Sequence, residues 1–336
     1  MKPLHSIQYL RALAALAVVG FHACQWRNGG FDLGRAGVDV FFVISGVIMW
    51  RVTISRESAP AVFIWRRFTR VAPLYWLITV ALAAVAVAWP AFLPNVHPAW
   101  GHLGLSLAFI PHLDPAGLPF PLLPPGWSLN YEAVFYGVFA ASLFAPRRLR
   151  VAVVAGALTA IALFGLLLYQ PAYFLGANPM LLEFAAGVAL ADLAESIRRP
   201  GRSFGLGLIG VGLAGYVVPA ALGGFSELWR PLLWGAPAAC IVTGALYLES
   251  CSAVPHWPWL DSLGDASYSI YLIHLPATAL VAHSLGVSNG WLFFPAAFAT
   301  SIGAGLACHI WLERPLIAFL RRAPAALVWV RAAPAG

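Results

Sequence analysis

Long apolar runs recur along this chain, and each is long enough to cross a lipid bilayer as one helix. About 20 helical residues cross the roughly 30 Å of hydrocarbon in a bilayer. Hydrophobic residues make up 61% of the 336 residues and charged residues only 10%, whereas a soluble domain is about a quarter charged. The sequence therefore predicts an all-α, polytopic integral membrane protein with about ten transmembrane helices. The predicted spans lie near residues 6–25, 36–55, 73–90, 127–145, 151–168, 178–196, 204–222, 230–248, 267–285 and 291–311.

The distribution of arginine predicts how these spans are oriented. Cytoplasmic loops of membrane proteins are enriched in Lys and Arg. With the amino terminus inside, ten spans place 15 arginines in cytoplasmic segments and 3 outside. Counting the short apolar stretch 100–112 as a further span would move Arg147, Arg148 and Arg150 to the outside, so we interpret that stretch as re-entrant or interfacial. Both termini are then predicted to be cytoplasmic.

Three other interpretations of the sequence are less satisfactory. The basic loops explain the net charge of +7, so the charge does not indicate a nucleic-acid partner. The four cysteines show no metal-ligand or redox spacing, and no metal site is predicted. The motif "GLGLIG", with Gly205, Gly207 and Gly210, matches a dinucleotide-binding fingerprint but lies in a membrane run with no strand before it. Small residues packing against a neighbouring helix explain it better.

Two ionisable residues lie within the first span. Arg11 and His22 are 11 residues apart, so on an α-helix they differ by about 20° in direction and about 16 Å in depth. They share one face, with Arg11 near the cytoplasm and His22 near the outer surface. Ionisable groups within a membrane are costly and usually line a cavity. The shared face therefore favours a functional path along this helix over a snorkelling arginine and a packed histidine.

Carboxylates on later helices can reach the depth of His22. Asp39 is about one turn deep in a span that enters from outside. In "WSLNYEAVFY", Ser128, Glu132 and Tyr136 are spaced i, i+4, i+8 and form a polar stripe on one face. We expect Asp39 and Glu132 to converge with His22 in the outer half of the membrane. A histidine oriented by a carboxylate is a usual general base, although a proton relay in a transporter would use the same residue types.

A cationic face is predicted at the inner interface. In "FIWRRFTRVAPLYW", Arg67 and Arg70 are spaced i, i+3 and present their guanidinium groups on one face. Such a face suits phosphates, and anionic lipid headgroups are the alternative ligand. A second polar line, in "SYSIYLIHLPAT", includes Tyr271 and His274 on a helix that enters from the cytoplasm.

Together these stretches resemble the acyltransferase 3 family of membrane O-acyltransferases over nearly the whole chain. Arg11 and His22 resemble the family's signature of Arg, ten residues and His, and Arg67-Phe68-Thr69-Arg70 resembles its Arg-x-x-Arg motif. Further matches are "GVDVFFVISG", "WSLNYE", "SYSIYLIH" and the closing "ERP". The amino-terminal "IQYLRALAAL" is most similar to the exopolysaccharide and Nod-factor O-acetyltransferase subgroup.

This resemblance implies transfer of an acyl group from cytoplasmic acyl-CoA, in the simplest case acetyl-CoA, to a sugar hydroxyl of an exopolysaccharide or other envelope glycan. The CoA phosphates would lie near Arg67 and Arg70, and the thioester would reach toward His22. His22 would take the hydroxyl proton while Asp39 holds the imidazole. The catalytic residues implied are His22, Asp39 and Glu132, and the donor-binding residues are Arg11, Arg67, Arg70, Tyr271 and His274.

The resemblance also implies a multi-pass protein of the bacterial inner membrane. Its expected partners are a polysaccharide or lipid-linked sugar acceptor, membrane lipid and polysaccharide-assembly proteins. Residues 1–315 are expected to form the transmembrane domain and residues 316–336 a cytoplasmic tail. Two alternatives stay open: transfer of succinyl or another acyl group to a lipid-linked or small glycoside, and a non-enzymatic permease or flippase for a lipid-linked sugar. The Arg-x-x-Arg face at the inner interface favours the enzyme.

Overall fold

The computed structural model describes residues 4–26, 29–55, 59–167, 178–196, 201–221, 225–286 and 290–322. Across these ranges the chain is helical and contains no β-strand, which confirms the all-α prediction. The α-helices are α1 (His5–Gln25), α2 (Gly37–Ser55), α3 (Pro60–Ala88), α4 (Trp100–Leu107), α5 (Trp127–Ser142), α6 (Arg147–Leu167), α7 (Leu181–Ser196), α8 (Arg202–Gly215), α9 (Val217–Ala221), α10 (Ala236–Ser250), α11 (Pro258–Leu285), α12 (Gly290–Cys308) and α13 (Arg314–Arg322). Short 3₁₀ or π turns are η1 (Asp32–Ala36), η2 (Pro124–Gly126), η4 (Glu227–Trp229), η5 (Pro231–Gly235) and η6 (His309–Glu313).

Within the described residues, seven helical stretches are long and apolar enough to cross a membrane, so the protein is multi-pass. They are His5–Gln25, Asp32–Ile54, Pro60–Ala88, Arg147–Leu167, Arg202–Pro219, Glu227–Ser250 and Gly290–Arg321. The other three predicted spans correspond to α5, α7 and α11. Helices α5 and α7 have only 16 residues each. Helix α11 is long enough, with 28 residues, but it is not among the stretches apolar enough to cross a membrane. The count of about ten therefore stays a prediction. The stretch interpreted as re-entrant or interfacial contains only the eight-residue α4.

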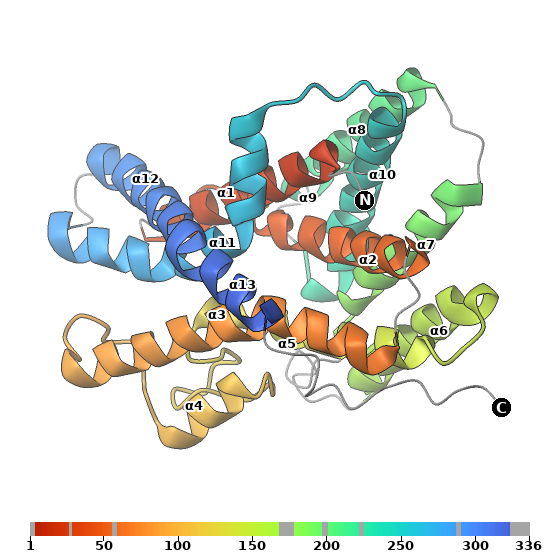
Figure 1. Ribbon diagram of the computed structural model, residues 1–336. Coiled ribbons are helices and arrows are strands. Elements are labelled where there is room, and N and C mark those ends of the chain that lie inside the picture. The colour runs from red at the N-terminus through yellow and green to blue at the C-terminus, as the bar shows by residue number, and fades with distance from the viewer. Residues whose placement is uncertain are drawn as a thin grey trace.

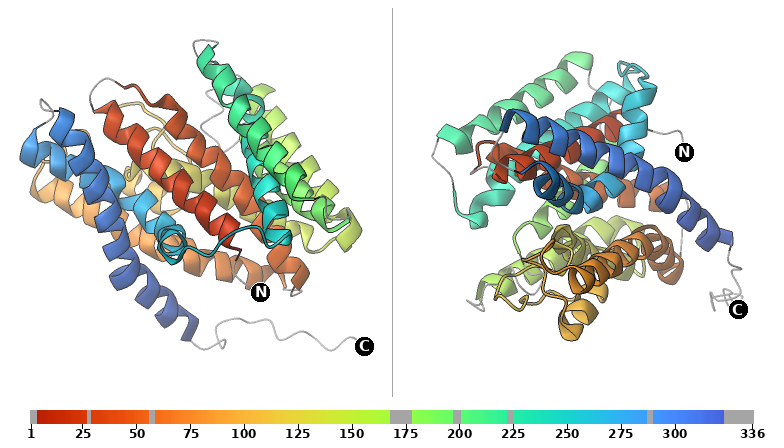
Figure 2. Two further views of the ribbon diagram at one scale, coloured as in Figure 1. Left: turned by 90° about the horizontal axis from the view of Figure 1, so that it is seen from above. Right: turned by 90° about the vertical axis from the view of Figure 1, so that its left-hand side faces the viewer.

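The helices form two tiers (Figures 1 and 2). Helices α3, α4, α5 and α6 lie together on one side, and α1, α2, α7, α8, α10, α11 and α12 lie on the other. In the larger tier α1 packs on α11, α11 on α12, α2 on α7, and α8 on α10. Contacts of α3 with α11, and of α5 with α2, join the tiers. The candidate site lies where they meet.

Glycines bring α2 and α7 into backbone contact. A Cβ added at Gly46 would lie 2.2 Å from the carbonyl oxygen of Phe184, and one at Gly187 would lie 2.1 Å from that of Val43. Neither distance leaves room for a methyl group. Small residues at a helix crossing allow such an approach in membrane proteins, where van der Waals packing rather than hydrophobic exclusion holds helices together.

The "GLGLIG" segment packs as predicted at one of its three glycines. A Cβ at Gly205 in α8 would lie 2.9 Å from the carbonyl oxygen of Gly244 in α10. Gly207 and Gly210, in contrast, have no heavy atom within 4 Å of an added Cβ. They face away from α10, because residues with the spacing of this fingerprint do not all lie on one face of a helix.

The predicted domain boundary at residue 315 falls within a helix. Helix α13 begins at Arg314 and continues to Arg322. The division into a transmembrane domain and a cytoplasmic tail stays a prediction, and residues 323–336 lie outside the described ranges.

Candidate active site

Three arginines from two helices line one pocket where the tiers meet. Arg11 comes from α1, whereas Arg67 and Arg70 come from one face of α3. The pocket has a volume of about 840 Å³, part of which is open to the outside of the protein, and we call it the arginine pocket. Helix α2 supplies much of the apolar wall, and Tyr271 of α11 also lines the pocket. The structure thus brings together four of the five residues expected to bind a donor.

The three arginines are only partly neutralised by neighbouring groups. Arg11 donates from Nη1 to Oε1 of Gln8 over 2.8 Å. Nη1 of Arg70 lies 3.8 Å from Oε1 of Glu313, which is too long for a hydrogen bond. The buried Nε of Arg67 has no hydrogen-bond partner among the described residues. Donors therefore remain for an anion, and guanidinium groups suit phosphate oxygens.

Glu313 is a functional candidate that the sequence reasoning used only as part of the closing "ERP" motif. Its carboxylate is buried and accepts from Oγ of Ser269 and from Nδ1 of His309, both over 2.7 Å. These contacts hold Glu313 beside Arg70. An acid at the end of an apolar run was the signal that could have identified it, because such a group needs a cation nearby.

Glu132 lies in the arginine pocket rather than beside His22. It accepts hydrogen bonds from Tyr136 and, over 3.3 Å, from Oγ of Ser45. The expected convergence of Glu132 with His22 is therefore wrong in its geometry. The stripe of Ser128, Glu132 and Tyr136 does share one face, but that face lines the pocket between α2, α3 and α5.

His22 is held by a second histidine. Its Nδ1 lies 3.0 Å from the carbonyl oxygen of Val18 and 3.1 Å from Nε2 of His274. Nδ1 of His274 lies 2.6 Å from the carbonyl oxygen of Tyr271. Since a carbonyl only accepts, His274 carries its proton on Nδ1 and accepts at Nε2. His22 therefore carries its proton on Nδ1, which leaves a lone pair on its Nε2, as a general base requires.

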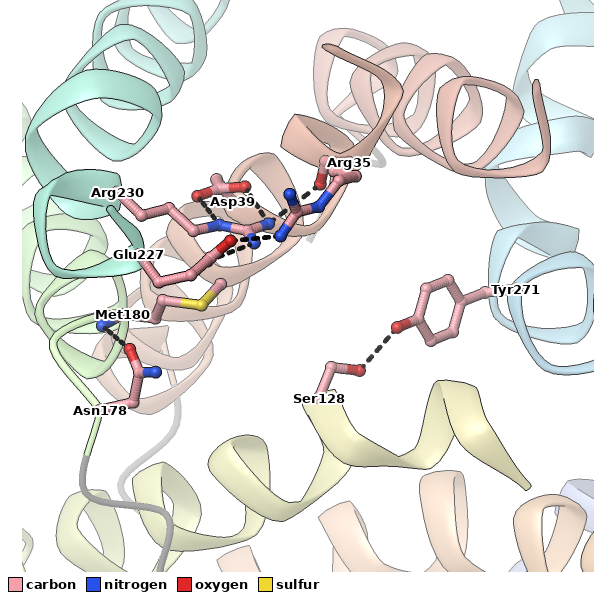
Figure 3. Close-up of polar contacts among 8 residues, drawn as sticks. All are labelled: Arg35, Asp39, Ser128, Asn178, Met180, Glu227, Arg230 and Tyr271. Atoms are coloured by element: carbon pink, nitrogen blue, oxygen red, sulfur yellow. Dashed lines mark hydrogen bonds and ion pairs between the residues drawn. The ribbon is translucent and has the colours of Figure 1, made fainter. Parts of the chain in front are cut away.

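Tyr271 connects the histidine pair to the arginine pocket. Its hydroxyl lies 2.9 Å from Oγ of Ser128, and both residues line the pocket (Figure 3). The carbonyl of the same tyrosine accepts from His274. His274 itself is fully buried, so it contacts the pocket through Tyr271.

The expected contact between Asp39 and His22 is wrong. Asp39 instead accepts from Arg230, with Oδ1 3.0 Å from Nε and Oδ2 2.9 Å from Nη2 (Figure 3). Both side chains are buried, at 0% and 3% exposure. A guanidinium meets both oxygens of a carboxylate at once, which a single imidazole nitrogen cannot do. Arg230 is one of the three arginines, with Arg27 and Arg35, that the sequence places outside, and its pairing with Asp39 was not predicted.

These features define a multi-pass membrane protein in which a pocket lined by three arginines is connected, through Tyr271 and His274, to His22. Residues 4–310 match the acyltransferase 3 family, described as an acyltransferase domain, and the chain belongs to that family. It is therefore a membrane-bound acyltransferase that transfers groups other than aminoacyl groups. The predicted resemblance is confirmed.

Two relatives cover most of the chain. The chain is 38% identical over 304 residues to the exopolysaccharide production protein ExoZ of Rhizobium meliloti, spanning 88% of this chain and 94% of that protein. It is 26% identical over 356 residues to the peptidoglycan O-acetyltransferase OatA of Listeria monocytogenes, spanning 93% of this chain and 55% of that protein. No solved structure matches the chain.

Proposed function

We propose that this protein moves an acyl group, in the simplest case acetyl, from cytoplasmic acyl-CoA to a sugar hydroxyl of an exopolysaccharide or other envelope glycan at the bacterial inner membrane. One observation carries the proposal: a continuous set of contacts runs from the arginine pocket through Tyr271 and His274 to Nδ1 of His22, and it leaves the other ring nitrogen of His22 free to accept a proton. ExoZ is named for exopolysaccharide production and OatA for peptidoglycan O-acetylation, which supports a glycan acceptor.

The donor would bind with its phosphates in the arginine pocket. Arg67 and Arg70 offer guanidinium donors there, and Arg67 has an unpartnered Nε. Arg11 would meet the same ligand from α1. The pantetheine arm would extend along α1 over the roughly 16 Å that separate Arg11 from His22 on a helix. This length of travel explains why an arginine and a histidine share one face of the first helix.

The reaction would be a direct attack on the thioester. The sugar hydroxyl oxygen adds to the thioester carbonyl, the new C–O bond forms and the C–S bond breaks. The hydroxyl proton passes to Nε2 of His22 and then to the departing CoA thiolate, so atoms and charge balance. Holding both substrates at one base replaces a rare encounter with an intramolecular step.

Acyl transfer by purified protein in lipid nanodiscs tests the proposal. Acetyl-CoA and polysaccharide isolated from the host are supplied, free CoA is measured with a thiol reagent, and the acetylated glycan is measured by mass spectrometry. Wild-type protein should release CoA only with the glycan, and His22→Ala should abolish this release while remaining folded. Glycan movement without CoA release would instead support the permease.

Arg70→Lys should raise the Michaelis constant for acetyl-CoA more than that for the glycan, because an ammonium does not reproduce a bidentate guanidinium. The loss should grow with ionic strength, since Arg70 is partly exposed and salt screens such a contact. Arg202→Lys, an exposed arginine outside the pocket, is the matched control. If Arg67→Ala and Arg70→Ala changed only the lipid dependence, the arginines would bind lipid and the donor would bind elsewhere.

A further inference from the structure

A second pocket lies on the opposite face of the amino-terminal turns of α5. Trp127, Asn130 and Tyr131 line this second pocket, whereas Ser128 and Glu132 line the arginine pocket. The second pocket has a volume of about 790 Å³, part of which is open to the outside of the protein. We call it the aromatic pocket. One helix therefore separates two sites of different chemistry.

The lining of the aromatic pocket combines flat rings with a few polar groups. Trp127 and Tyr131 meet edge to face with their ring centres 5.8 Å apart, and Phe120 lies at the same pocket. Aromatic side chains offer large apolar faces, and ligand sites typically add a small number of placed polar groups to such faces. A pyranose ring has the matching surface, because its C–H faces are apolar and its edge carries hydroxyls.

Two amides supply hydrogen-bonding groups at the pocket. Asn130 is only 6% exposed, and its buried Oδ1 has no hydrogen-bond partner among the described residues. Asn178 uses its Oδ1 to accept from the backbone N–H of Met180 over 2.9 Å, which orients its amide group at the pocket (Figure 3). A buried acceptor without a partner is costly, and a ligand hydroxyl lying at Asn130 would remove that cost.

The charges at the aromatic pocket balance. Arg35 pairs with Glu227, and Arg230 pairs with both Glu227, at 3.1 Å, and Asp39, at 2.9 Å (Figure 3). Two cations and two carboxylates are paired in these contacts, and a further buried acid, Glu183, lies beside Asp39 and Arg230. A uronic acid or a phosphate would meet no excess positive charge here, in contrast to the arginine pocket. An uncharged ligand with hydroxyls, which both donate and accept, fits this balanced network.

The aromatic pocket also lies near the carboxyl-terminal end of α1. Cζ of Arg35, which lines the pocket, is 6.0 Å from the ring centre of Phe21, the residue before His22. Its lining segments around residues 35, 111–120 and 227–230 are those that the arginine distribution predicts to be external. We infer that the aromatic pocket binds an uncharged sugar residue of the acceptor glycan, an inference that rests on the proposed function.

Direct binding in the absence of a donor tests this inference. Cellotetraose, a neutral glucan, and a galacturonic acid tetrasaccharide of the same length are titrated into the full-length protein in nanodiscs by calorimetry. Cellotetraose should bind more tightly than the acidic tetrasaccharide. Trp127→Ala and Asn130→Ala should each weaken binding of cellotetraose about tenfold or more. Phe120→Ala, whose side chain is 39% exposed, should also weaken it without opening the core.

Matched variants outside the pocket serve as controls. Trp100→Ala, at a side chain that is 88% exposed, and Asn95→Ala, also exposed, should bind cellotetraose like the wild type. Tighter binding of the acidic tetrasaccharide would overturn the inference, as would equal binding by the wild type, Phe120→Ala and Asn130→Ala. If neither tetrasaccharide binds although the host polysaccharide still triggers CoA release, the inference fails and the proposed function stands. If cellotetraose binding depends on Trp127 but no acyl transfer is detected, the result would support sugar binding in the aromatic pocket and contradict the proposed function.

Discussion

His22 keeps its Nε2 free because two acceptors, the carbonyl of Val18 and Nε2 of His274, meet its other nitrogen. We therefore propose that His274 is a positioning residue, which holds the tautomer of the base without touching substrate. His274→Phe should lower kcat by about 10- to 100-fold and leave the Michaelis constant for acetyl-CoA unchanged, whereas His22→Ala should lower kcat further, since general-base catalysis contributes roughly 10²–10⁴-fold. Steady-state kinetics of both variants check this.

The control for His274→Phe is His283→Phe, an exposed histidine on the same helix. It should keep wild-type kcat. A His274→Phe protein with normal kcat would contradict the positioning role, and one with a raised Michaelis constant for acetyl-CoA would assign His274 to donor binding instead.

For the buried pair of Asp39 and Arg230 we expect an effect on stability. Removing one partner of a buried ion pair costs about 3–5 kcal/mol when the other charge is left uncompensated. Arg230 keeps a second carboxylate, Glu227, at 3.1 Å, so the loss of Asp39 should cost less than that range. Asp39→Asn should therefore lower thermal stability in detergent, and the Asp39→Asn, Arg230→Gln double variant should recover part of the loss because no full charge is left unpaired. If Asp39→Asn were as stable as the wild type but had a reduced kcat, this result would contradict the structural role of Asp39 and would indicate that Asp39 orients the base.

These residues show how far the sequence could predict the site. Helical spacing correctly grouped Arg67 with Arg70, because that spacing depends on one helix alone. Depth in the membrane could also have paired His22 with His274. His22 lies 17 residues after the first residue of α1, and His274 lies 16 residues after the first residue of α11, so the two are at similar depths. The predicted span began at residue 267, nine residues after Pro258, and this hid the match. Depth alone does not fix direction around a helix, which is why Asp39 was assigned the wrong partner.

At the scale of helices, the α2–α7 crossing depends on glycine. A Cβ at Gly187 would lie 2.1 Å from the carbonyl oxygen of Val43. Gly187→Ala should destabilise the protein by about 1–3 kcal/mol, the usual cost of overpacking. Gly210→Ala in α8 is the matched control, because nothing lies within 4 Å of its added Cβ. Thermal unfolding in detergent compares the two, and equal stability would contradict backbone contact at this crossing.

Apolar length predicted most helices but not their limits. The two spans that match helices of only 16 residues, α5 and α7, were predicted longer than they are. The span predicted over 127–145 begins where α5 begins, at Trp127 after the 3₁₀ turn that contains Pro124 and Pro125, but it extends past the end of the helix at Ser142. The tier arrangement was not predictable either, because contacts such as α3 with α11 join segments far apart in the chain.

At the scale of the whole molecule, the distribution of arginine predicts the membrane topology. Arginine-rich segments at 66–70, 147–150 and 198–202 should share the cytoplasmic side with both termini. Reporter fusions after residue 150 and at residue 336 should both report cytoplasm, and a fusion within the segment 111–120 should report the outside. An external signal at either of the first two positions would also reverse the predicted sides of the two pockets.

The backbone contact between α2 and α7 limits how the arginine pocket can evolve. Helix α2 forms one wall of the pocket through Phe42 and Met49 and cannot move back, since Gly46 and Gly187 already bring its backbone against α7. Extra room must come from smaller side chains or from movement of α3 or α11. Engineering toward donors with a bulkier phosphate-bearing end should therefore begin at Val71 of α3. Random libraries should yield gains on that side of the pocket before they yield any at the α2–α7 crossing.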